Sequence, residues 1–277
     1  MYSQIFPQIV YLPLGYSCKI IVNTQNIYKR LTSYSDAEVV FSLKFFRDGK
    51  LFKEENKNII FSKSNIKSHP DLEFELEDQS DLGLKSPGFL ELSINSKENL
   101  PIFSSRSLTG VSNYIIHYKN KKKSFLSDPA YKVGSPPVIQ QFAAHKMYLD
   151  TYPIIDINVE KDLGESLAFI NPYPKSILAK VVTMDGREIK SIKVDALSCR
   201  QINLKDLLKN HSENEWRGHI QITANNRVIV YNLKHSFKDI ELISDVEHLD
   251  PYRGELNFLP LTQGIRIFLG NLLRSIK

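Results

Sequence analysis

Four side chains in the second half of the chain have types that suit ligand binding. Trp216, Arg217 and His219 lie within four positions, and Tyr231 follows in the next apolar segment. Aromatic faces pack on the C–H faces of sugar rings, and neighbouring polar groups donate or accept the hydrogen bonds that orient the sugar. These residues predict a saccharide site, with a polar rim drawn from Tyr173, Arg217, His219 and Asn232. The alternative is that Trp216 is a loop aromatic covering the core.

A second group, in the stretch "DVEHLDPYRG" at 245–254, has the residue types of a metal or acid-base site. Carboxylates and a histidine would be supplied by Asp245, Glu247, His248 and Asp250. In an extended strand the first two face one side and the last two the other, so all four meet one metal only if the chain bends. Because "SDPAYKVG" at 127–134 echoes this stretch, we interpret both as turns that end a module.

The remaining motifs exclude several classes of protein. The basic run "KNKKK" at 119–123 has no interleaved aromatic residues, so it predicts a hairpin tip rather than a nucleic-acid surface. The only cysteines, Cys18 and Cys199, form no CxxC pair, so we expect neither a disulfide framework nor a zinc ribbon. Because no nucleotide-binding, nucleophile-elbow or zinc-protease signature occurs, we predict no cofactor.

The strands that must position these side chains are visible as period-two alternation. In "LEFEL" at 72–76, apolar and acidic residues alternate as a half-buried strand requires, and "LELSI" at 90–94 and "HIQIT" at 219–223 repeat the pattern. Further strands are predicted at 18–22, 38–46, 113–118, 166–170, 177–183, 189–194, 200–204 and 228–233. Helical periodicity is nearly absent before residue 262. The fold class is therefore all-β and antiparallel, as a sandwich or barrel.

The two halves of the chain repeat the same features in the same order. Each contains a hairpin with an Asp-Gly turn, then a glycine leading into an alternating strand, then an apolar strand that leaves through a basic turn. Two tandem β-sandwich modules are therefore predicted, at 1–137 and 138–259, joined near Pro136 and Pro137.

The last segment, 260–277, is predicted to be a short amphipathic helix. Its apolar stripe has helical spacing and its other face is basic. The helix could dock on its own module, pair with another subunit, or lie on an anionic membrane surface.

The stretches "ESLAFINPY", "AKVVTMDG", "IKVDALSCRQINLKDL" and "RVIVYNLK", between Glu165 and Lys234, resemble the sensory rhodopsin transducer family of small β-sandwich proteins. The resemblance implies an antiparallel sandwich that assembles into oligomers and works by binding carbohydrate or a signalling partner. It transfers no functional residue. The duplicated chain and the added terminal helix depart from the family.

The composition is that of a globular protein. Its 36 basic residues are nearly balanced by 31 acidic ones, so the chain as a whole creates no strong electrostatic field. The first residues have no basic region before the apolar run, and no stretch reaches transmembrane length, so we expect a cytoplasmic protein. The sequence favours a non-enzymatic binding or scaffolding protein with a saccharide or protein ligand, forming a homo-oligomer. The alternatives are an enzyme using Asp245–Asp250, and membrane or partner association through the terminal helix.

Overall fold

The computed structural model divides the chain into two compact units. It describes residues 2–3, 7–31, 36–62, 64, 70–77, 86–98, 100, 113–132, 148–151, 153–208, 214–224 and 228–249. The first unit lies within Met1–Val133 and also takes Glu241–His248, and the remaining described residues form the second. The segment 241–248, which we had assigned to the second module at 138–259, therefore belongs with the first unit by its contacts.

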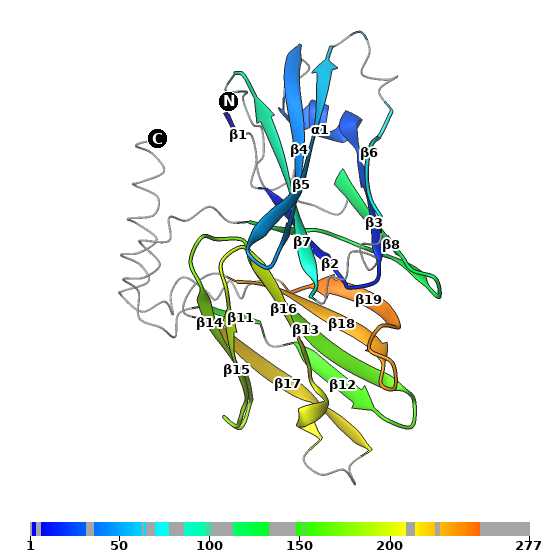
Figure 1. Cartoon of the computed structure of the whole chain (residues 1–277), viewed down its shortest axis with the longest axis vertical. Coiled ribbons are helices and arrows are strands. Elements are labelled where there is room, and N and C mark those ends of the chain that lie inside the picture. Colours follow the sequence, from blue (N-terminus) through cyan, green and yellow to red (C-terminus); the bar gives the residue numbers. More distant parts are fainter. Residues whose placement is uncertain are drawn as a thin grey trace. The chain divides into compact units, whose positions relative to one another are not determined.

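The first unit contains two antiparallel sheets, which form separate groups in Figure 1. One sheet has the order β10-β2-β7-β4-β5, and β1 adds to β7. Its strands are β1 (Tyr2–Ser3), β2 (Gln8–Leu12), β4 (Ala37–Arg47), β5 (Lys50–Phe61), β7 (Gly88–Ser96) and β10 (Ala130–Tyr131).

The other sheet of the first unit has the order β6-β3-β8-β9. Its strands are β3 (Ser17–Val22), β6 (Leu72–Leu76), β8 (Tyr114–Lys119) and β9 (Ser124–Ser127). A short helix, α1 (Thr24–Leu31), follows β3, although we had predicted almost no helix before residue 262. Its buried Ile27 and Tyr28 give it an apolar side too short for the periodicity to be recognised in the sequence.

The second unit is also built from antiparallel strands. Its strands pair in two series. One has the order β15-β14-β17-β12, with β11 added to β17, and the other has the order β16-β13-β18. The two series are joined by the pairing of β12 with β13. The strands are β11 (Tyr148–Thr151), β12 (Ile154–Asn158), β13 (Leu163–Asn171), β14 (Ile177–Thr183), β15 (Glu188–Val194), β16 (Ser198–Asn203), β17 (Glu215–Ala224) and β18 (Ile229–Ser236). A 3-10 turn, η4 (Lys205–Leu207), follows β16.

Both units follow the same pairing order. In the first unit the strands run β2-β7-β4-β5 and β6-β3-β8, and in the second β12-β17-β14-β15 and β16-β13-β18. The hairpins β4–β5 and β14–β15 turn at Asp48-Gly49 and Asp185-Gly186, where both glycines and Asp48 have positive φ. The matched sequence features therefore occupy matched positions in the two sets of strands.

Each unit has an apolar core made by alternate residues of its strands. In the first, Val39, Phe41 and Leu43 of β4 are buried, and the Tyr118 hydroxyl of β8 donates to the Tyr11 carbonyl of β2, which links the two sheets. In the second, Phe169 belongs to a buried apolar cluster drawn from most of the strands. The prediction of an antiparallel all-β chain is confirmed. The predicted terminal helix at 260–277 lies outside the described residues.

Candidate functional site

Strand alternation separates the residues that were expected to form a saccharide site. Trp216 lies inside β17, not in a loop, and packs partly against the core of the second unit. Its indole lies over Gly218, where a Cβ atom would come within 3.1 Å of the ring. Arg217 and His219 are exposed on the opposite face, with the Arg217 Nε 3.9 Å from the Asp156 carboxylate. Successive residues of a strand point to opposite faces, so these side chains do not surround one ligand.

Tyr231 and the other residues expected near it are interior. Tyr231, in β18, has no exposed surface, and Tyr173 belongs to the core of the second unit. The Asn232 amide donates to the Glu165 carboxylate at 2.8 Å, and both side chains are buried. None of these side chains reaches a ligand from solvent in this conformation.

The histidine of the acidic stretch belongs to the first unit. His248 ends β19 (Ile243–His248), and its Nδ1 lies 2.9 Å from the carboxylate of Asp128, a residue of the echoed stretch at 127–134. The Ser127 hydroxyl donates to the Val246 carbonyl of the same strand. Nowhere among the described residues do three or more His, Cys, Asp or Glu side chains gather to hold a metal. Asp250 lies outside the described residues.

Tyr16 forms hydrogen bonds with the backbone at the beginning of the segment 241–248. Its hydroxyl donates to the Glu241 carbonyl at 2.7 Å and accepts the Ile243 N–H at 3.1 Å. The ring is buried, and the bond from the Ile243 N–H is buried with it. Of the stretch 245–254, which we had interpreted as a terminating turn, residues 245–248 lie in β19, and β19 groups with the first unit.

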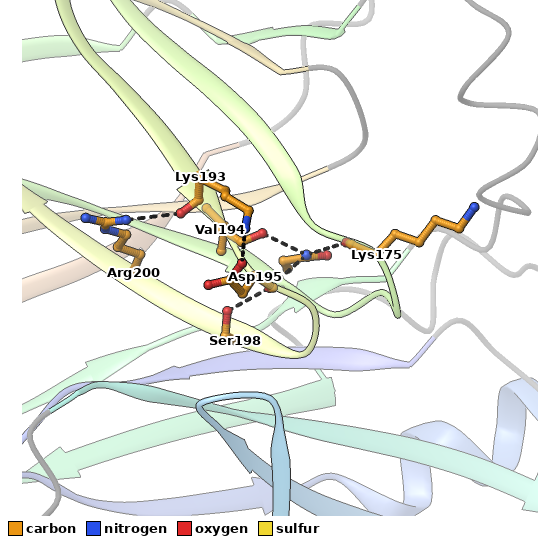
Figure 2. Close-up of polar contacts among 7 residues, drawn as sticks. Lys175, Lys193, Val194, Asp195, Ser198 and Arg200 are labelled. Carbon is orange, nitrogen blue, oxygen red and sulfur yellow. Dashed lines mark hydrogen bonds and ion pairs between the residues drawn. The ribbon is translucent and has the colours of Figure 1, made fainter.

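A second polar cluster joins two turns of the second unit (Figure 2). The buried Asn171 amide donates to the carbonyls of Lys175, Val194 and Asp195, and its oxygen accepts the Tyr173 N–H. Figure 2 shows Ser198 reaching Asp195 and Arg200 reaching the backbone of Lys193, at 2.7 and 3.2 Å. Because these contacts end largely on backbone carbonyls, the cluster fixes the turns and presents no ligand site.

Buried groups in the first half of β13 and at the end of β18 have the types of a catalytic pair but lack access to solvent. His235 Nε2 lies 2.7 Å from the Ser166 hydroxyl, and Nδ1 lies 2.7 Å from the Ser236 carbonyl. Burial lowers the pKa of His235 and raises the pKa of Glu165. Ser166 has no exposed surface, so its hydroxyl cannot attack a substrate. We interpret the pair as structural.

Among the described residues of the first unit, an open polar groove of about 760 Å³ lies over β5, β4 and β7. Strand register arranges its side chains in rungs that cross the three strands. The central rungs carry uncharged groups: Asn56, Ser42 and Ser93 in one, and Asn58, Val40 and Asn95 in the next. Charged rungs lie on either side, with Glu54, Lys44 and Glu91 at one end and Glu38 with Lys97 at the other.

The charges at the ends of the groove neutralise one another. Glu38 pairs with Lys97 at 2.8 Å, Lys44 approaches Glu54 at 3.8 Å, and Glu91 pairs with Lys132 at 2.8 Å. The groove therefore offers no net charge to a ligand.

The uncharged centre offers hydrogen-bonding groups. Asn95 donates to the Ser93 hydroxyl at 3.2 Å. The side-chain amides of Asn56 and Asn58 make no hydrogen bond within the part of the chain that the structure describes. These amides can each donate and accept bonds from a ligand.

Sequence reasoning missed this groove because the β4–β5 hairpin is combined with the distant strand β7, and no residue of the groove is unusual alone. The available signal was the run of small polar residues at alternate positions of predicted strands, such as Ser42 and Ser93. Only the register of β4 against β5 and β7 shows that they share a rung.

Comparison with known proteins gives little further information. No family model matches the chain. A search of curated proteins also finds no match. Among solved structures, the chain is similar to a "Biofilm associated protein - BSP domain" at 7% identity with a TM-score of 0.23, covering 86% of this chain and 53% of that one. The chain thus spans about half the length of that protein. The resemblance to the transducer family stays a prediction.

Within the described ranges, no helix has both the length and the apolar character needed to span a bilayer.

Proposed function

We propose that the protein is a non-enzymatic binding or scaffolding protein whose first unit binds a neutral, hydroxyl-rich ligand of the oligosaccharide class. In this proposal each unit is a β-sandwich, and the ligand lies in the groove over β5, β4 and β7. The observation that carries the proposal is the uncharged pair of rungs around Ser42, bordered by ion pairs that cancel.

The chemistry of the groove favours an oligosaccharide over a protein ligand. Protein interfaces depend on buried aromatic and aliphatic anchors, whereas the described lining of the groove carries Val40 and Pro7 as its apolar groups. Hydroxyl groups of a sugar both donate and accept hydrogen bonds, as do the amides of Asn56, Asn58 and Asn95. Balanced charge at the rim gives no preference for an acidic glycan.

Glycan-array binding followed by calorimetry with the best neutral oligosaccharide would test the proposal. The double variant Asn58→Leu/Asn95→Leu removes both amides of one rung. If each contributes about 1 kcal/mol, the affinity should fall about 30-fold. The matched control, Asn214→Leu, removes an exposed amide from the second unit and should bind like the wild type.

Trp216→Ala distinguishes this site from the one predicted by sequence. We expect the variant to keep the wild-type affinity because Trp216 belongs to the other unit. Loss of binding in Trp216→Ala with full binding in the groove variant would overturn the proposal. So would the absence of binding to any neutral glycan.

A further inference from the structure

Strand β5 forms one edge of its sheet and is long for an edge strand. It has 12 residues and pairs with β4 alone among the strands that the structure describes. The other side of β5 therefore presents a row of backbone N–H and C=O groups to a potential partner strand. Natural edge strands of this length usually carry features that prevent indiscriminate pairing.

The side chains of β5 restrict which partner can pair with it. On the face opposite the groove lie three charged residues in succession, Lys53, Glu55 and Lys57. Lys57 contacts Glu55 at 3.2 Å, donates to the Glu73 carbonyl and lies over the Phe74 ring. Lys53 also lies 3.4 Å from Glu55. A partner strand that presents opposite charges beside Glu55 and Lys57 is therefore favoured over an apolar one.

We propose that β5 pairs antiparallel with β5 of a second copy of this chain, with the two-fold axis at Asn56. In this register Glu55 of each copy lies opposite Lys57 of the other, so two opposite-charge pairs form. Glu54 lies opposite Asn58, and the two Asn56 amides face each other. The inner faces of both sheets stay on the same side, as a continuous sheet requires.

Neighbouring registers are disfavoured by like charges. Moving the axis to Glu55 places that residue opposite itself and Lys53 opposite Lys57. Moving it to Lys57 places two lysines face to face. Like charges directly opposite each other destabilise a sheet, so the register centred on Asn56 is favoured over those centred on Glu55 and Lys57.

The regular part of β5 is long enough for this pairing. The pairing of β5 with β4 shifts register between Phe45 and Phe46 and is regular from Lys53 to Phe61. The segment that is symmetric about Asn56, Lys53–Ile59, lies within this regular part.

The paired sheet would extend the groove across both copies, since Glu54, Asn56 and Asn58 line it and lie at the junction. The inference goes beyond the proposed ligand and does not depend on it. Cross-linking detects the dimer whether or not an oligosaccharide binds.

Cysteine cross-linking tests the register directly. Directly opposed residues of antiparallel strands have Cα atoms about 4.5–5.5 Å apart, within disulfide range. Asn56→Cys should therefore give a disulfide-linked dimer under mild oxidation. Asn58→Cys is the matched control on the same face, because its two copies would be offset by four residues, about 13 Å along the strands. The native Cys18 and Cys199 are buried and should not react.

Charge reversal provides an independent measurement by sedimentation of the wild type and variants. Glu55→Lys places lysines opposite each other and should convert a concentration-dependent dimer into a monomer. The combined Glu55→Lys/Lys57→Glu variant restores both opposite-charge pairs and should restore the dimer. A wild type that stays monomeric at every concentration, or equal cross-linking at positions 56 and 58, would overturn the inference.

Discussion

The same polar residue types have opposite surroundings in the two units. In the second unit, Glu165 is 4% exposed and accepts the Asp156 N–H and the Asn232 amide, both at 2.8 Å. In the first unit, Glu54 and Asn56 lie on an open strand of the groove. A buried carboxylate must have its bonds satisfied within the protein, whereas an exposed one exchanges them with water or ligand. The difference shows that a cluster of polar groups indicates a binding site only where its face of the sheet is exposed to solvent.

The largest expected effect comes from truncating the buried carboxylate. Glu165→Ala leaves the Asp156 N–H and the Asn232 amide without their acceptor and should lower the free energy of unfolding of the second unit by about 2–3 kcal/mol. Glu54→Ala is the exposed counterpart and should change stability by less than about 0.5 kcal/mol. Urea unfolding of both variants would measure the difference. Equal losses of unfolding free energy in the two variants would contradict the difference that we infer between the buried and the exposed carboxylate.

A smaller effect is expected from the pH dependence of the buried histidine. Because burial lowers the pKa of His235, the unfolded chain takes up a proton below about pH 6.5 before the folded chain does. The stability that neutral His235 contributes is therefore present above pH 6.5 and is lost as the pH falls toward the folded pKa. Glu165, with a raised pKa, acts in the opposite direction, because the folded chain keeps its proton above the usual 4.5.

Comparison with His235→Gln isolates the histidine contribution from that of Glu165. The stability advantage of the wild type over this variant should shrink by about 1 kcal/mol between pH 7.5 and 5.5. Chemical unfolding at each pH measures it. An advantage that stays constant or grows on acidification would contradict the assignment of His235 as a buried neutral group.

The smallest expected effect on stability comes from a substitution beneath the Trp216 ring, in the unit that does not contain the groove. Gly218→Ala places a methyl group 3.1 Å from the indole, and the ring should move toward water at a cost of about 1 kcal/mol. Trp216 is the only tryptophan, so a red shift of its emission would report the movement directly. Unchanged emission would show that the ring does not rest on Gly218. Binding in the groove should be unaffected.

Much of the fold could be predicted from local patterns. The strands at 72–76 and 177–183 have the bounds that alternation predicted, because one buried and one open face impose a period of two. The Asp-Gly turns were recognisable because tight hairpins need positive φ. Helix α1 was missed because its eight residues span only about two turns.

The candidate site could not be predicted because it depends on pairing between distant segments. Trp216 and Arg217 are adjacent in sequence yet face opposite sides of β17, whereas Ser42 and Ser93 are far apart yet share a rung. The attachment of β19 to the first unit has the same origin, since the contact of His248 with Asp128 joins residues more than a hundred positions apart.

The sequence by itself determined the all-β class, the repeated order of strands and the hairpin turns, because these follow from the side-chain period and the backbone preferences of neighbouring residues. The tertiary structure alone decided which polar side chains share an open face, which are interior, and which unit holds the segment 241–248. The physical reason is that exposure and register arise from contacts between strands distant in the chain, and no local pattern records them.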